Sequence, residues 1–130
     1  MATPESPRRL IVTADDFGRS PAINEAVALA HQRGILTCTS LMVAGKAFED
    51  AVRIARDHPR LGVGLHLTLL GGHSCLSRHT IPDLVDAQQQ FSSNPVAAGL
   101  RYFWVRHLRS QLAAEITAQF NRFRATGLPL

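Results

Sequence analysis

Several features that assign chains to common classes of protein are scarce or absent in these 130 residues. The two cysteines, Cys38 and Cys75, have no metal-binding spacing, which argues against a cysteine-based zinc site and favours a reduced, cytoplasmic chain. No apolar run approaches the length of a membrane span, so no membrane-spanning segment is predicted. Residues 1–8 are polar and lack the apolar core of a signal peptide, and we expect them to form a disordered tail.

Basic residues outnumber acidic ones, with a net charge of +4, but their pattern is not that of a nucleic-acid-binding protein. The arginines are scattered, no basic run is longer than Arg8-Arg9, and few aromatic residues alternate with them for stacking on bases. We therefore expect no nucleic-acid partner. One basic concentration, residues 101–109, surrounds Tyr102-Phe103-Trp104. A solvated helix face is the favoured interpretation of this segment, and peripheral contact with a membrane surface is the alternative.

The apolar residues that are present predict a single α/β domain. Hydrophobic residues make up 45% of the chain and charged residues 18%, a balance typical of a folded protein. Apolar and β-branched runs predict three strands, at residues 9–14, 37–43 and 62–68. Helical spacing and capping residues predict that helices follow the first two strands, at residues 20–34 and 46–58. This alternation predicts parallel strands, whose carboxyl ends are where sites collect in such folds.

The C-terminal part of the chain has a different pattern. Residues 70–94 show no periodicity, and loops of this length in compact domains are usually functional or disordered. A last helical region is predicted to begin near Asn94-Pro95. Its second half places four apolar residues on one stripe, namely Leu112, Ile116, Phe120 and Phe123.

Two adjacent carboxylates, Asp15 and Asp16, stand at the end of the first predicted strand and precede Phe17-Gly18. A cap or turn explains one such aspartate, but a pair beside a buried strand is costly unless its charge is used. Neighbouring residues of a strand face opposite ways, so the pair converges on one site only if the backbone turns there. We expect one carboxylate to bind a divalent cation and the other to accept a proton from a water that the cation acidifies.

His66 lies at the end of the third predicted strand. A period of two puts Gly64, His66 and Thr68 on one face of that strand, with the leucines on the other. Taken alone, such a histidine is most simply a core residue bonded to a backbone carbonyl. Imidazole nitrogen and carboxylate oxygen are both ligands of divalent metals, so we expect Asp16 and His66 to approach within about 5 Å. Asn24, in the first turn of the first helix, is expected to face solvent.

Motifs in the same order carry a resemblance to a known family. They are Val12-Thr13-Ala14-Asp15-Asp16-Phe17-Gly18, Ser20-Pro21, Asn24-Glu25-Ala26, Thr39-Ser40-Leu41-Met42 and Gly64-Leu65-His66-Leu67-Thr68-Leu69. Together they resemble the YdjC-like carbohydrate deacetylases, and the resemblance runs from about residue 9 to the end of the chain. The sequence of residues 40–45 and 123–130 is most similar to that of the hopanoid-biosynthesis-associated branch of the family.

The resemblance implies a fold, a reaction and roles for three residues. It implies an incomplete (β/α) barrel-like fold, with about three parallel β/α units of a distorted TIM-like barrel. It implies a metal-dependent hydrolase that removes acetyl from an N-acetylated amino sugar, such as an N-acetylglucosaminyl hopanoid lipid. Asp15 would be the catalytic base, and Asp16 and His66 would bind the divalent metal, magnesium or zinc. Residues 9–130 would be the N-terminal part of one deacetylase domain, with the third ligand and the general acid beyond residue 130.

Two interpretations from other classes remain open. The chain could be a non-catalytic α/β module that binds a partner or forms oligomers through an exposed sheet edge, or a basic surface-binding domain. Half of a barrel would leave a strand edge and an apolar inner face without partners, and such surfaces pair readily. We therefore expect a homo-oligomer, and we expect metal titration to separate the enzyme from the surface-binding domain.

Overall fold

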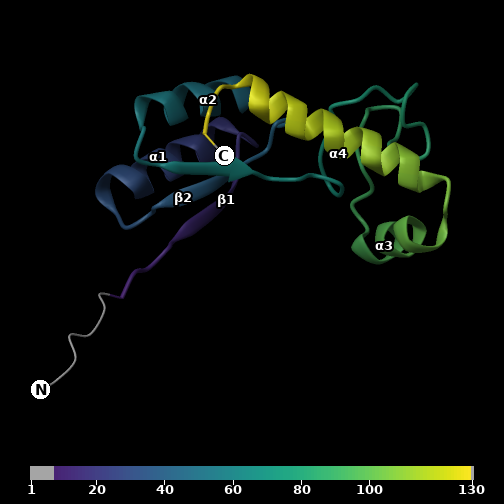
Figure 1. The fold of residues 1–130 in the computed structure, drawn as a ribbon, viewed down its shortest axis with the longest axis horizontal. Coiled ribbons are helices and arrows are strands. Elements are labelled where there is room, and N and C mark those ends of the chain that lie inside the picture. Colours follow the sequence, from purple (N-terminus) through teal and green to yellow (C-terminus); the bar gives the residue numbers. More distant parts are fainter. Residues whose placement is uncertain (1–7, 130) are drawn as a thin grey trace, which may run out of the picture.

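The structure is a computed structural model that describes residues 8–129, so most of the predicted tail at residues 1–8 lies outside the described residues. Three parallel strands form one sheet in the order β1-β2-β3, as predicted (Figure 1). The elements, in chain order, are β1 (Thr13–Phe17), α1 (Pro21–Arg33), β2 (Cys38–Leu41), α2 (Phe48–Asp57), β3 (Gly62–Leu65), α3 (Pro95–Trp104) and α4 (Leu108–Ala125). The predicted α/β class is confirmed, and a barrel-like continuation stays a prediction.

The first strand lies further along the chain than predicted. Leu10 and Ile11 precede it and are about three-quarters exposed, whereas Asp15 and Asp16 lie within it. The strand continues past the carboxylates because Phe17, which is fully buried, still pairs with β2. The polar pair therefore does not end the strand, as its sequence suggested.

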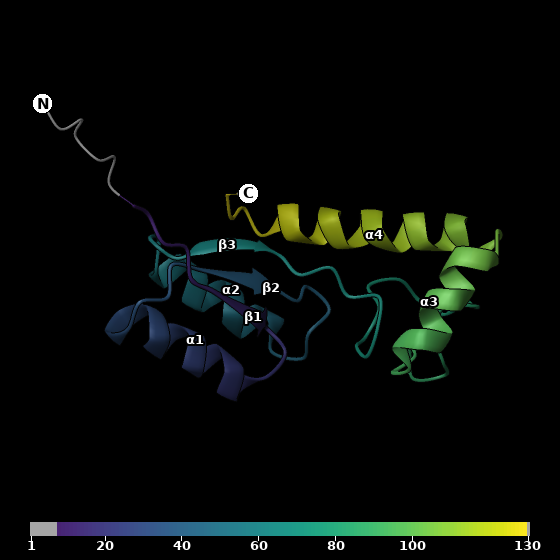
Figure 2. The ribbon, with the colours of Figure 1, turned by 90° about the horizontal axis from the view of Figure 1, so that it is seen from below.

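The first two helices begin and end close to the predicted positions. Ser20 caps α1, because its hydroxyl accepts a hydrogen bond from the amide of Ile23, and Pro21 occupies the first helical turn. Helix α2 buries Phe48, Ala51 and other small or apolar residues on one face. Both helices pack on the same core as the sheet, so one face of the sheet is covered (Figure 2).

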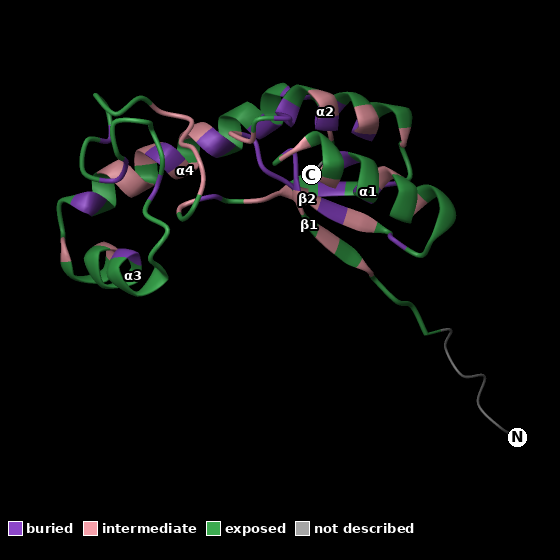
Figure 3. Cartoon of the chain, turned by 180° about the vertical axis from the view of Figure 1, so that it is seen from behind, coloured by how far each residue is buried: buried purple, intermediate pink, exposed green. Residues whose placement is uncertain are grey.

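The last helical region consists of two helices, α3 and α4, which residues 105–107 separate. Helix α4 buries a different stripe from the apolar one predicted, because Glu115 and Gln119 are fully buried while Phe120 is 40% exposed. The C-terminal end of α4 reaches the main core, where Phe123 is fully buried. Figure 3 shows the buried positions of α4 alternating with exposed ones along its length.

Strand β3 ends at Leu65, before its predicted end at residue 68, so the irregular segment covers residues 66–94 and includes the loop predicted at residues 70–94. This segment packs around a second apolar cluster. Its buried members are Ile81, Leu84, Val85, Phe91 and Leu108. This segment and α3 form a lobe beside the carboxyl ends of the strands, which point towards it (Figures 1 and 2). The long loop therefore contributes a wall near the strand ends.

The uncovered face of the sheet is not the apolar surface expected from half of a barrel. The residues of the strands that point away from the core are small or polar, namely Thr13, Asp15, Cys38, Ser40, Gly62 and Gly64. All of them are exposed or partly exposed. The alternation that buries Thr39 and Leu41 against the helices leaves these side chains on the open face. Because this face is polar, the argument for a homo-oligomer from an apolar inner face finds no support in the described residues.

Candidate active site

The backbone turn that the two carboxylates need lies at Asp16 itself. Asp16 has φ +64°, in the left-handed region, and the register of β1 against β2 shifts between Ala14 and Phe17. Such a bulge adds a residue to one strand and re-aims its side chains. Aspartate tolerates the left-handed conformation better than most residues do. Non-glycine residues in this conformation are found most often at functional sites. The turn lets adjacent side chains serve one site.

Asp16 and His66 lie close together, as the sequence predicts. The Nε2 atom of His66 is 3.7 Å from Oδ1 of Asp16, and both side chains are about one-third exposed. His66 is the first residue after β3, and its amide donates to the carbonyl of Leu41, which continues the ladder by one bond. Gly64 leaves open space, since a Cβ atom there would meet nothing within 4 Å.

Ser40 connects the two predicted functions of the site. Its hydroxyl, on the middle strand, donates to Oδ1 of Asp15 at 2.8 Å and lies 2.9 Å from Nδ1 of His66. A serine hydroxyl has one proton, and an ionised carboxylate only accepts. Because Asp15 takes that proton, Nδ1 of His66 must donate to the Ser40 oxygen. In the neutral imidazole, Nε2 is then the bare nitrogen, and it faces Asp16.

Arg19 balances the charge of Asp16. Its Nη1 atom donates to Oδ2 of Asp16 at 2.8 Å, which leaves Oδ1 directed towards His66. This pair is partly exposed, so its contribution to stability is small, on the order of 0.5 kcal/mol. Its effect on the site is to fix which carboxylate oxygen faces the imidazole.

The donor atoms of Asp16 and His66 fit a divalent cation. A carboxylate oxygen and a bare imidazole nitrogen present two lone pairs to each other, and a cation about 2.1 Å from each atom spans their separation. The hydrogen bond that Nδ1 of His66 donates to Ser40 orients the ring, as a hydrogen bond from the second ring nitrogen does in metal-binding histidines. Within residues 8–129, no three His, Cys, Asp or Glu side chains are grouped to hold a metal ion. Two of the described residues, Asp16 and His66, therefore fit a divalent cation as ligands.

Two polar side chains of α4 fix the path of the chain after His66. Gln119 accepts from the amide of Thr68 and donates to its carbonyl, at 2.9 and 2.8 Å. The carboxylate of Glu115 accepts from the amides of Cys75 and Leu76, and also from the amide group of Gln119. Burial, aided by the Glu115 carboxylate, raises the pKa of the Cys75 thiol. The network joins the segment that leaves β3 to a helix far along the chain.

Asn24 is fully buried, contrary to the expectation that it faces solvent. Its Oδ1 accepts from the amide of Gly18 at 2.7 Å, and its Nδ2 donates to Ala47 and to Asp50. The hydrogen bond from Asn24, and then that from Arg53, lower the pKa of Asp50. Asn24 therefore joins the turn after β1 to the start of α2, a structural role at the base of the site.

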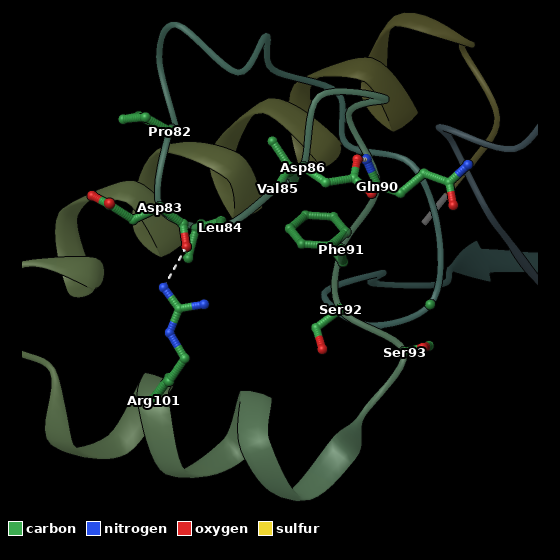
Figure 4. Close-up of a pocket in the computed structure, with 11 residues that line it drawn as sticks. Pro82, Asp83, Leu84, Val85, Asp86, Gln90, Phe91, Ser92, Ser93 and Arg101 are labelled. Atoms are coloured by element: carbon green, nitrogen blue, oxygen red, sulfur yellow. Dashed lines mark hydrogen bonds between the residues drawn. The ribbon is translucent and has the colours of Figure 1, made fainter.

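One large hollow of the described surface does not lie at the carboxylates. It has a volume of about 600 Å³ and lies between the long loop and α3, where Phe91 and Arg101 face it (Figure 4). A smaller hollow of about 330 Å³ lies beside the site and is lined by Arg19, Lys46 and His73, among others. This smaller hollow is the one next to Asp16, since Arg19 lines the hollow and also pairs with Asp16.

Ser40 and Arg19 were not among the residues that the sequence singled out. Ser40 belongs to one of the quoted motifs, but a serine in a strand has no pattern that distinguishes a bridging role. Arg19 follows the carboxylates at a spacing of three from Asp16, which is a signal for local pairing. Both roles depend on the register of neighbouring strands and on the bulge.

Comparison with known proteins places these features in a family. The model of the YdjC-like protein family matches residues 9–130. The chain belongs to this family. A carbohydrate deacetylase of Brevibacillus brevis is 38% identical over 122 residues, which cover 94% of this chain and 46% of the relative. A carbohydrate deacetylase of Geobacillus stearothermophilus is also 38% identical, over 123 residues, with the same coverage. The chain thus spans about half the length of the curated relatives it matches.

A solved structure has the same fold. A crystal structure from Enterococcus faecalis V583, of a protein whose suggested activity is cellobiose-phosphate cleavage, aligns with a TM-score of 0.76 and 30% identity. The alignment covers 94% of this chain and 46% of that one. The predicted family is confirmed by these matches, and assignment to the hopanoid-associated branch stays a prediction. No helix in residues 8–129 is both long enough and apolar enough to cross a membrane.

Proposed function

We propose that this YdjC-like chain carries part of the active site of a metal-dependent hydrolase that removes acetyl from N-acetylated amino sugars. The observation that carries the proposal is the arrangement of Asp15, Ser40, His66 and Asp16 across three strand ends. It combines a carboxylate that is bonded to Ser40 with a carboxylate–imidazole pair whose lone pairs face each other. The names of the relatives supply the substrate class.

The residues divide the work by position. Asp16 and His66 would hold a divalent metal, zinc or magnesium, which in such sites polarises an amide carbonyl and acidifies water. Asp15 lies on the open face and would accept the proton of the attacking water. Ser40 keeps Asp15 and the imidazole in one hydrogen-bonded chain, so that His66 presents Nε2. A third protein ligand and a general acid would come from residues outside 8–129.

The finer substrate is part of the proposal. The sequence of residues 40–45 and 123–130 resembles that of the hopanoid-associated branch. We therefore propose an N-acetylglucosaminyl hopanoid lipid, or another N-acetylated glycolipid, as the substrate. The open polar face, on which a Cβ atom at Gly64 would meet nothing within 4 Å, leaves room for a sugar beside the site. A cytoplasmic protein that acts at the membrane surface would meet such a substrate.

Metal titration with matched variants tests the proposal. Zinc and magnesium are titrated by calorimetry, and the imidazole nitrogens are followed by NMR. We expect weak binding that shifts the Nε2 resonance of His66, and we expect Asp16→Asn or His66→Ala to weaken it at least tenfold. Acetate release from N-acetylglucosamine oligosaccharides is measured in parallel.

The variants separate the two roles. Asp15→Asn should keep metal binding and lose any acetate release, because it removes only the proposed base. Asp57→Asn is the control, since that carboxylate is exposed on α2 and lies away from the site. Metal binding that is unchanged by both Asp16→Asn and His66→Ala would contradict the proposed site.

A non-catalytic binding module is the second candidate, and the edge of the sheet favours it. Leu10 and Ile11 are exposed beside β1, which has no partner on its outer side among the described residues. Such an edge can pair with another chain or with a second copy. Sedimentation of the wild type against Ile11→Lys tests this: an oligomer that the variant dissociates supports edge pairing, and a monomer in both cases contradicts it.

A further inference from the structure

One face of α3 exposes four large apolar side chains. Val96, Leu100, Phe103 and Trp104 are between 55% and 70% exposed, and their spacing places them on one stripe of the helix. The rings of Phe103 and Trp104 pack edge to face, with centroids 5.0 Å apart. Apolar side chains scattered singly are ordinary on surfaces, but a continuous stripe indicates a contact surface.

The opposite face of α3 is anchored, which fixes the direction of the stripe. Ala98 is buried, and the hydroxyl of Tyr102 donates to the carbonyl of Leu69 at 2.8 Å. The guanidinium of Arg101 donates to the carbonyl of Asp83 at 2.9 Å. Because these contacts hold the helix against the loop, the stripe cannot rotate inwards. Helix α3 lies at the end of the molecule away from the sheet (Figure 2).

Two arginines follow the stripe directly along the chain. Arg106 and Arg109 are exposed, and no side chain among the described residues forms an ion pair with either. The nearby carboxylate of Asp83 already accepts from Gln111 at 2.7 Å and lies 3.6 Å from His107. The two arginines are therefore available to an external anion.

We propose that the stripe of α3 and these arginines dock the protein on an anionic membrane surface. Aromatic and aliphatic residues on one helix face, with arginines beside them, form the pattern of a helix that lies in the lipid interface. Lipid phosphates would accept hydrogen bonds from Arg106 and Arg109, while Phe103 and Trp104 enter the boundary between headgroups and acyl chains. This inference is independent of the proposed deacetylase activity.

A second copy of the chain fits the same surface less well. A ten-residue helix is about 15 Å long, so one of its faces falls short of the roughly 800 Å² per partner of a standard interface. An anionic bilayer presents a broad surface of the complementary charge.

The single tryptophan makes the docking directly measurable. Trp104 is the only tryptophan of the chain, so its emission reports on the stripe alone. With vesicles of equal parts phosphatidylglycerol and phosphatidylcholine, we expect cosedimentation and a blue shift of the emission. With phosphatidylcholine alone we expect much weaker binding. Neutralising both arginines, by Arg106→Gln and Arg109→Gln, should weaken binding about 30-fold.

A matched pair of apolar variants completes the test. Leu100→Ser with Phe103→Ser keeps the fluorescent probe and should weaken binding at least tenfold, whereas Ile35→Ser should have no effect. Ile35 is equally exposed but lies just before β2, at the other end of the sheet. The proposal is overturned if neither vesicle is bound, or if the double serine variant binds as the wild type does. It is also overturned if the blue shift of Trp104 occurs without vesicles and sedimentation shows self-association under the same conditions.

Discussion

Replacement of Glu115 by alanine should be one of the most destabilising substitutions of a polar residue in this protein. Glu115 is fully buried, and its carboxylate accepts three hydrogen bonds, at 2.8, 2.9 and 2.8 Å, from Cys75, Leu76 and Gln119. Truncation leaves the two backbone amides without acceptors, and each such loss costs about 1–3 kcal/mol. We therefore expect Glu115→Ala to lower the free energy of unfolding by about 3–5 kcal/mol.

The conservative variant Glu115→Gln should lower the free energy of unfolding by less than Glu115→Ala does. Glu115→Gln keeps one acceptor oxygen but turns an NH₂ group towards one of the backbone amides. One hydrogen bond is lost, while the burial of a charge is relieved, so we expect a loss of about 1–2 kcal/mol. Glu25→Ala is the control, because Glu25 is exposed on α1 and should change stability by less than about 0.5 kcal/mol.

Urea unfolding followed by circular dichroism measures these differences. A domain stabilised by about 5–15 kcal/mol would lose a large part of its stability in the alanine variant. The loop after His66 should also become more accessible, which faster alkylation of Cys75 would report. If Glu115→Ala costs less than about 1 kcal/mol, the three hydrogen bonds do not hold the loop to α4, and the reasoning fails.

Three further predictions concern the surroundings of the site. Gly45→Ala should lower the free energy of unfolding by at least about 2 kcal/mol in urea, because a Cβ there would overlap a backbone carbonyl, whereas Gly99→Ala meets open space and should be neutral or slightly stabilising. Iodoacetamide should label Cys38 before Cys75 in peptide mass spectra, since hydroxyl hydrogen bonds lower the pKa of the first thiol and burial raises that of the second. Native interactions lower the pKa of Asp50 below its ordinary 3.8, so the stability advantage of the wild type over Asp50→Asn should be present above that pH and lost as the pH falls through the native pKa; an advantage that persists at the lowest pH would contradict this.

The order of strands and helices could be predicted because each depends on local pattern. The β-branched residues in and around β2 and the Ser20-Pro21 start of α1 act within a few residues, and both elements appear where expected. The limits of β1 could not be predicted in the same way. Asp15 and Asp16 look like the end of a strand, but pairing with β2 and the bulge at Asp16 extend it to Phe17.

The buried face of α4 could not be predicted because it depends on the groups that the helix contacts elsewhere in the chain. Apolar periodicity indicates a stripe through Ile116 and Phe120, since burial of an unpaired carboxylate or amide is costly. Glu115 and Gln119 avoid that cost by bonding to backbone groups roughly 40 to 50 positions earlier in the chain. No feature within the helix indicates those partners, which are defined only when the loop after β3 folds against it.

The candidate site shows the same division between local and long-range information. Asp15, Asp16 and His66 are recognisable because charged or titratable groups at strand ends need an explanation. Ser40 is not, although it determines what His66 can do. If its hydroxyl were removed, the neutral imidazole could carry its proton on either nitrogen, and Nε2 would no longer be kept without a proton. Since Ser40 lies between Asp15 and His66 only through the parallel register of all three strands, the sheet itself selects the tautomer. The chemistry of this site is therefore determined by strand pairing as much as by the residues that would perform it.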